Sequence, residues 1–234
     1  MRHQTSGLPG GGGADRLGGR LALLAPDSLS AEQRQVYDAL CDLVVPEAEQ
    51  GGFTARLPDG RLIGPFNALL RDPRLTSGFG QWVRAIGAGG LPTDVRETII
   101  LTVGAEWGAA YEIYAHRAAG AAAGLPLEAI EAILSGAAPN GLTPVAQLAH
   151  RLTRALVVDH SVPEALYAEA RAEFGEAGLL TVLGLIAQYQ LISSVLVCFD
   201  VPVPRPGAGH DVSDVGSGRP ASGRRESRCS QQIC

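Results

Sequence analysis

Three residues within one short stretch have the types and the spacing that acid/base chemistry requires. Glu97 lies on one expected helix, and Glu112 and His116 lie four positions apart on the next. Residues four apart share a helix face, so Glu112 can accept a hydrogen bond from one nitrogen of His116. Such a contact fixes the tautomer of the ring, favours its protonated form and leaves the other nitrogen for a substrate. The pattern predicts an acid/base histidine, and the alternative is a surface ion pair without a catalytic role.

The neighbours of these residues favour a position at a helix contact. Glu97 shares a helix face with Leu101, and the face of His116 carries the small residue Gly120. Small residues let helices approach closely, and burial there disfavours a charge that has no partner. For Glu97 the alternative is a carboxylate that only complements the dipole at the start of its helix.

The apolar periodicity predicts helices almost throughout the chain, roughly eight of them, and no sheet. Ser30 begins the first helix with a capping pattern, and Pro46 is expected to end it. The other expected helical segments are 65–70, 74–88, 94–105, 109–123, 126–134, 143–158, 163–174 and 177–199. The segment 94–105 is apolar nearly all round, so we expect it at the centre of the molecule.

These helices form one domain over residues 20–204. Residues 1–19 and 205–234 are rich in small and polar residues and lack apolar periodicity, so we predict that both are disordered tails. The segment 179–199 is long enough to span a membrane, but glutamines and serines occupy its middle. We therefore interpret it as a core or interface helix and expect no contact with a membrane.

Composition excludes several classes of function. The net charge is −5, which argues against a nucleic-acid partner. Only 18% of the residues are charged, so part of the surface is expected to be covered in a homo-oligomer, a dimer or a trimer. The four cysteines form no C-x-x-C pair, which predicts neither a disulfide framework nor a zinc site and suits the cytoplasm.

No metal site is predicted either. The chain has no H-E-x-x-H motif, and Ala115 rather than a histidine stands three residues after Glu112. His150 and His160 are interpreted as surface or capping residues.

The stretch 96–124 (RETIILTVGAEWGAAYEIYAHRAAGAAAG) resembles the core motif of the carboxymuconolactone decarboxylase family, which shares an all-helical fold with the alkylhydroperoxidase D-like proteins. Segments 21–41, 64–75 and 189–204 resemble parts of one branch of the family. In its redox branch a Cys-x-x-Cys pair precedes the histidine, and these positions correspond to Ala109 and Glu112. The chain is therefore similar to the non-redox members.

The resemblance implies an all-α, alkylhydroperoxidase D-like bundle and an enzyme that needs no cofactor. The expected reaction is decarboxylation or a proton shift on a small unsaturated lactone carboxylic acid. His116 is the implied acid/base, Glu112 orients it, and Glu97 is a second carboxyl group.

Three further residues are candidates for contact with the substrate. Arg96 is expected to bind a carboxylate, with a surface or subunit-contact role as the alternative. Tyr111 and Trp107 are candidate pocket walls, with packing in the core or an interface as the alternative.

Two other classes of function remain open. The first is a peroxidase-like redox enzyme that uses Cys198 or another thiol. Cys41 and Cys198 stand alone in apolar helical patterns, where buried cysteines are usually inert. The second is a non-catalytic helical oligomer that binds a ligand, in which Glu97 and His116 would face solvent or the pocket would be collapsed.

Overall fold

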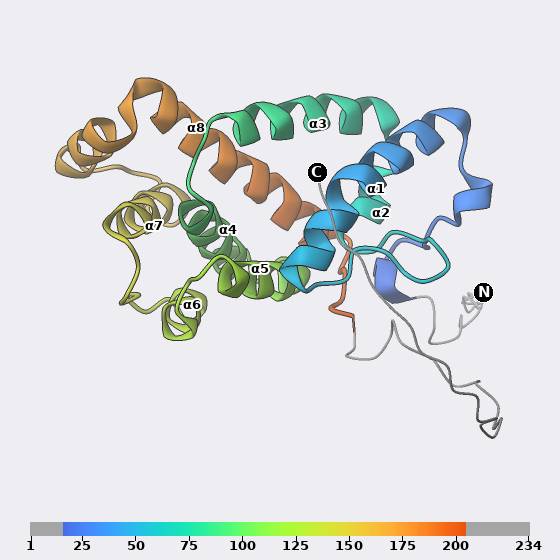
Figure 1. Cartoon of the computed structure of the whole chain (residues 1–234), viewed down its shortest axis with the longest axis horizontal. Helices are drawn as coiled ribbons and strands as arrows, with labels where there is room; N and C mark the ends of the chain where they lie inside the picture. The colour runs from blue at the N-terminus through green and yellow to red at the C-terminus, as the bar shows by residue number, and fades with distance from the viewer. Residues whose placement is uncertain (1–15, 205–234) are drawn as a thin grey trace, which may run out of the picture.

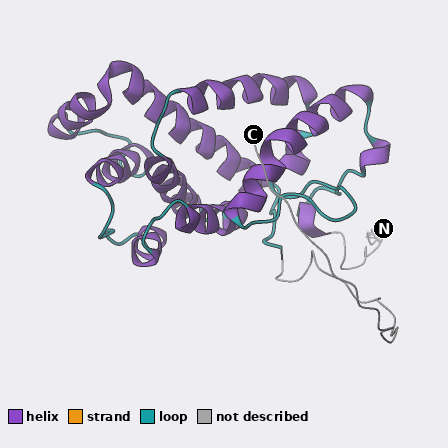
Figure 2. Ribbon diagram, viewed as in Figure 1, coloured by secondary structure: helices purple, strands orange, loops and turns teal. Residues whose placement is uncertain are grey.

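A computed structural model describes residues 16–204, which fold into α-helices joined by loops (Figures 1 and 2). No strand occurs within this part of the chain, so the predicted all-α class is confirmed. The eight helices are α1 (Ala31–Gly51), α2 (Pro65–Leu69), α3 (Pro73–Ala88), α4 (Thr93–Trp107), α5 (Ala110–Ala122), α6 (Leu127–Leu134), α7 (Pro144–Val157) and α8 (Glu164–Cys198).

Helix α4 is the central element, as its apolar sequence predicts. Val95, Ile99 and Val103 are fully buried, in one cluster with apolar residues of α7 and α8. Helices α5 and α6 also pack on α4. A helix that is apolar on every side has to be enclosed on every side, which explains its place.

Helices α1, α2 and α3 form the other part of the molecule. Helix α1 packs on α5 and α3, while α2 and α3 contact α8 (Figure 1). The indole nitrogen of Trp82 on α3 donates a hydrogen bond to the carbonyl of Gly184 on α8, at 3.3 Å. These helices therefore surround one side of the α5–α8 pair.

The start of α1 follows the prediction, but its end does not. The Ser30 hydroxyl accepts from the Gln33 amide, and the Gln33 side chain accepts from the Ser30 amide, as the capping pattern predicts. The predicted end at Pro46 is wrong, because the helix continues through this proline to Gly51. Burial of Ala48 in the next turn and the left-handed glycine that follows the helix favour this longer form.

Helix α8 contains both of the helices that were predicted over 163–174 and 177–199. They meet at Gly175, whose backbone is not helical (φ 66°, ψ 178°). By length and composition α8 is able to cross a membrane, and 44% of its most apolar window is buried in the fold. Val182 and Leu185 belong to the core cluster around α4, which favours the interpretation as a core helix.

The predicted tails lie mostly outside the described residues. Residues 1–15 and 205–234 are not described, so their predicted disorder is untested. The prediction is wrong for residues 16–19, because Arg16–Gly18 form a 3-10 turn. The next residue, Arg20, donates its amide to the carbonyl of Phe199, at 2.7 Å. This contact ties the start of the domain to the end of α8.

Candidate active site

The central feature of the site is a hydrogen-bonded pair formed by His116 on α5 and Glu97 on α4. Nδ1 of His116 lies 2.8 Å from Oε2 of Glu97, so its N–H donates to the carboxylate. The two side chains are 16% and 10% exposed. No partner for Nε2 of His116 occurs within residues 16–204, which leaves this nitrogen for a substrate.

Glu112 does not orient the histidine, so this part of the prediction is wrong. Its Oε2 accepts a hydrogen bond from the hydroxyl of Ser193 on α8, at 2.9 Å. The spacing of four residues places Glu112 and His116 on the same helix face, but the carboxyl group turns toward α8. Oε1 of Glu112 is buried and has no hydrogen-bond partner in the described part of the chain.

The connection between α4 and α5 explains why these groups come so close together. Gly108 adopts a left-handed conformation (φ 60°) that ends α4 and reverses the chain into α5. Gly104 lies opposite Glu112, where an added Cβ would be 3.0 Å from Oε1. The absence of a side chain at Gly104 therefore makes room for the buried carboxyl group.

The environment of His116 favours its protonated form. Burial acts to lower the pKa of the ring, but the charge and the hydrogen bond of Glu97 outweigh this effect and raise the pKa. The ionised form of Glu112 adds to the increase, and Arg96 opposes it.

Glu112 is held mainly as a neutral acid at pH 7. Desolvation raises the pKa of this carboxyl group to about 8, although His116 and the Ser193 hydroxyl act in the opposite direction. Glu112 is only 2% exposed. The site thus combines one hydrogen-bonded histidine–carboxylate pair with one protonated carboxyl group.

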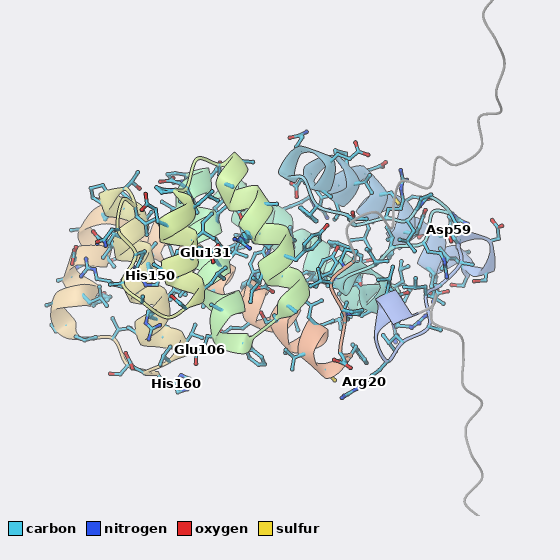
Figure 3. All side chains as sticks on the ribbon, turned by 90° about the horizontal axis from the view of Figure 1, so that it is seen from below. Arg20, Asp59, Glu106, Glu131, His150 and His160 are labelled. Atoms are coloured by element: carbon cyan, nitrogen blue, oxygen red, sulfur yellow. The ribbon has the colours of Figure 1, made fainter. Side chains whose placement is uncertain are left out.

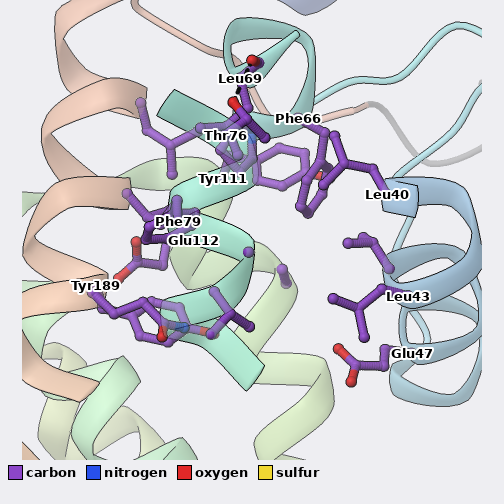
Figure 4. A pocket seen from close by; sticks show the side chains of 18 of the residues that line it. Leu40, Leu43, Glu47, Phe66, Leu69, Thr76, Phe79, Tyr111, Glu112 and Tyr189 are labelled. Atoms are coloured by element: carbon purple, nitrogen blue, oxygen red, sulfur yellow. Dashed lines mark hydrogen bonds between the residues drawn. The ribbon is translucent and has the colours of Figure 1, made fainter. Parts of the chain in front are cut away.

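A cavity of about 150 Å³ lies beside these residues (Figure 4). Helix α1 provides one wall, and Glu112 and Tyr189 lie across from it. Most of the remaining wall is apolar. The lining residues are Leu40, Leu43, Val44, Glu47, Phe53, Pro65, Phe66, Leu69, Thr76, Phe79, Gly80, Val83, Tyr111, Glu112, Ala115, His116, Gln188, Tyr189, Ile192 and Leu196.

The three predicted substrate contacts differ in their positions. Tyr111 lines the cavity, and its hydroxyl donates to the carbonyl of Thr54 at 2.5 Å. Trp107 does not line it: this residue is the last of α4, and its side chain is 39% exposed, so the predicted pocket wall is wrong. Arg96 is not a lining residue either, although its charge acts on His116.

Several residues of the site could not be predicted from the sequence, and they lie on helices distant in the chain. The rings of Tyr189 on α8 and His116 are perpendicular, with their centroids 5.1 Å apart. Gln188 lines the cavity beside it, and Glu47 reaches it from α1. The polar residues within apolar α8 indicate a buried polar site, but from the sequence they were used only to argue against a membrane-spanning helix.

The other histidines and the cysteines lie elsewhere. His150 and His160 are at the end of the molecule opposite Asp59 (Figure 3). The prediction of a surface or capping role is wrong for His150, which is buried with Nδ1 2.9 Å from the Thr102 hydroxyl. Cys198 is exposed and Cys41 is half-buried, and neither lines the cavity. Residues 16–204 contain no group of three metal-binding side chains.

The fold and this site define an all-helical protein with a buried histidine–carboxylate pair beside an apolar cavity. Residues 73–155 match the model of the carboxymuconolactone decarboxylase family. The matched segment contains Glu97, Glu112 and His116. The predicted resemblance is therefore confirmed.

A solved structure with a similar fold supports the predicted alkylhydroperoxidase D-like architecture. The chain is similar to the alkylhydroperoxidase AhpD core of an uncharacterized peroxidase-related protein from Ralstonia eutropha JMP134, with a TM-score of 0.62 and 17% sequence identity. The match covers 80% of this chain and 93% of that one. A comparison with curated proteins finds no match.

Proposed function

We propose that the protein is an acid/base enzyme that moves a proton to or from a carbon atom next to an unsaturated carbonyl group. Decarboxylation of a small unsaturated lactone acid and a proton shift on a related carbonyl compound are the two forms of this chemistry. The observation that carries the proposal is the 2.8 Å contact between His116 and Glu97 at the edge of a partly open, apolar cavity.

His116 is the proton carrier in this proposal. In a proton shift, neutral Nε2 takes a proton from the carbon, and the electron pair of that C–H bond moves into the carbonyl group. The imidazolium then returns a proton to another carbon of the conjugated system. In decarboxylation, the bond to the carboxylate breaks, carbon dioxide leaves, and the imidazolium supplies the proton that replaces it. Neither the proton shift nor the decarboxylation consumes an oxidant or a reductant.

Glu97 takes the positioning role that the sequence analysis gave to Glu112. Its carboxylate holds Nδ1, which fixes the ring orientation and stabilises the imidazolium that forms during the reaction. Glu112, as a neutral acid bonded to Ser193, supports the α5–α8 contact next to the histidine. Burial of the His116–Glu97 pair also argues against a non-catalytic oligomer with these groups in solvent.

The proposal is tested with His116→Gln and a panel of unsaturated lactone acids and cyclic enones. Carbon dioxide release and deuterium uptake from the solvent measure the two forms of the reaction. We expect the substitution to lower the rate by about 10²–10⁴-fold without loss of the helical fold. The matched control is His160→Asn, which changes an exposed histidine remote from the cavity and should react at the wild-type rate. Unchanged turnover in folded His116→Gln would disprove the catalytic assignment.

The alternative is a thiol-dependent peroxidase, because the similar solved structure is described as that of a peroxidase-related protein. Peroxide reduction through a disulfide needs a thiolate and a second thiol. Neither Cys41 nor Cys198 lines the cavity with His116, so the two side chains lie outside the proposed site. A peroxide assay on wild type and on the Cys41→Ser, Cys198→Ser double variant separates the two functions. Thiol chemistry predicts activity that the double variant loses.

A further inference from the structure

The cavity beside His116 has a charge pattern that restricts its ligand. Among its lining residues there is no arginine or lysine, and Arg96 lies outside the lining. The one basic group, His116, already has its charge balanced by Glu97 at 2.8 Å. Glu47 adds a carboxylate from α1 that acts on Tyr189 across the cavity.

Within the lining itself an anionic ligand would therefore meet no free cation, because Arg96, whose charge acts on His116, lies outside it. Moving a carboxylate out of water is costly unless a paired charge and hydrogen bonds replace its hydration. Here the nearest cationic ring is shared with Glu97, and Glu47 is repulsive. An uncharged ligand avoids this cost.

The size and the walls of the cavity indicate the size and the polarity of the ligand's ring. Its volume of about 150 Å³ suits one six-membered ring with a small substituent. Phe66, Leu69 and Phe79 contribute to an apolar wall from α2 and α3. An apolar ring gains free energy when it leaves water for such a surface.

Besides Oε1 of Glu112, a second buried polar atom of the lining has no partner, and it indicates the functional group. Gln188 is 8% exposed, and its Oε1 is buried without a hydrogen-bond partner in the described part of the chain. A buried acceptor of this kind is costly to leave unpaired, so a ligand that donates an N–H or O–H would stabilise the complex. In the proposed proton shift Nε2 of His116 is the neutral base, so the carbon that loses its proton lies beside this nitrogen.

We infer that the cavity binds an uncharged, single-ring carbonyl compound that carries an N–H or O–H donor, with its ring on the apolar wall and its polar group between His116 and Gln188. The inference rests on the proposed acid/base function and selects the proton shift over decarboxylation, because the ligand has no carboxylate to lose.

The test compares two probes of nearly identical shape, cyclohex-1-ene-1-carboxamide and cyclohex-1-ene-1-carboxylate. Their dissociation constants with the full chain are measured at pH 7 by calorimetry or ligand-observed NMR. We expect the amide to bind at least about tenfold more tightly than the carboxylate, a difference of about 1.4 kcal/mol. Equal or tighter binding of the carboxylate, or no binding of the amide at millimolar concentration, would overturn the inference.

Two variants test the residues behind this preference. Gln188→Met keeps the shape of the side chain but removes the acceptor, and it should weaken amide binding about five- to tenfold. Glu47→Gln should strengthen carboxylate binding about two- to fivefold and leave the amide unaffected. The matched control is Glu49→Gln, because Glu49 is an exposed carboxylate of the same helix that does not line the cavity. If Gln188→Met does not fold, the Glu47→Gln comparison decides: an unchanged carboxylate affinity counts against the inference.

Failure of this inference and failure of the proposed function give different results. If the carboxylate is preferred while His116→Gln still abolishes proton transfer, the acid/base function stands and the ligand class is wrong. If the amide is preferred but His116→Gln leaves proton transfer unchanged, the ligand class stands and the function is wrong.

Discussion

Nδ1 of His116 and Oε2 of Glu97 lie 2.8 Å apart, although the two residues belong to different helices and are separated by 19 positions in the chain. The pair spans the contact between α4 and α5 near the centre of the fold. Because it depends on this contact, the protonation of the histidine is linked to the packing of the two helices.

The first prediction concerns the titration of His116. Glu97→Gln removes the negative charge that raises the pKa of the ring, while burial continues to lower it. The titration observed by NMR should therefore move to lower pH. Glu49→Gln, which removes an exposed carboxylate outside the cavity lining, should leave the titration in place. An unchanged His116 titration in Glu97→Gln would show that the 2.8 Å contact is not maintained in solution.

The same pair contributes to stability with a defined sign. The pKa of His116 is raised in the folded state, so the ion pair stabilises the fold fully below about pH 6.5, the pKa of the unfolded residue. This contribution is lost as the pH rises through the folded pKa. In Glu97→Gln the free energy of unfolding should therefore fall less as the pH rises above about 6.5. Urea unfolding at a series of pH values measures this difference.

The second prediction concerns Glu112. Its folded pKa is about 8, against 4.5 for the ordinary carboxyl group, so folding at neutral pH takes up a proton. Its contribution is complete below about pH 4.5 and disappears as the pH rises through about 8, on the order of 4–5 kcal/mol in total. Glu112→Gln should unfold with a flatter pH dependence and exceed wild type in stability at pH 9. Equal slopes for the two proteins between pH 5 and 9 would contradict the buried neutral acid.

The two carboxylates also show what the sequence was able to predict. The spacing of Glu112 and His116 correctly placed both on one helix face, and the apolar pattern of residues 94–105 correctly placed α4 in the core. The choice of Glu97 as the partner of His116 depends on how α4 and α5 are rotated against each other. That rotation is set by close contacts such as Gly104 against Glu112, which no local pattern contains.

The walls of the cavity could not be predicted from the sequence either, because they depend on contacts between helices that are distant in the chain. Leu40 and Phe79 lie on α1 and α3, far in sequence from His116, and their pattern indicates only an apolar face. Whether such a face closes on its neighbours or leaves a cavity depends on side-chain volumes across several helices. Gln188 looked like a polar interruption of an apolar helix until its neighbours were known.

The third prediction concerns Gly64, which immediately precedes α2 and lies beside Tyr111. Its backbone (φ 65°, ψ −148°) lies in a region that other residues avoid, and a Cβ would come within 2.4 Å of the Tyr111 ring. Gly64→Ala should destabilise the protein by about 2–5 kcal/mol in urea unfolding, since strain and overpacking add.

The control for this variant is Gly52→Ala. Gly52 also has a positive φ (73°), but nothing lies within 4 Å of the added Cβ. Its cost should be about 1–2 kcal/mol, from backbone strain alone. Equal losses in the two variants would mean that the Tyr111 contact contributes nothing.

The last prediction concerns the exposed apolar face of α8, which we propose as a contact between copies of the chain. Leu180, Leu183 and Leu191 are 68%, 37% and 42% exposed, and their spacing of three and eight residues places them on one helix face. An apolar patch of this kind on a helix is typical of a subunit interface. We expect light scattering to give a dimer or trimer of the 24.3 kDa chain, and Leu183→Glu combined with Leu191→Glu to give a monomer. The control is Leu75→Glu, at an exposed leucine of α3, which should leave the mass unchanged; a monomeric wild type would rule out the interface.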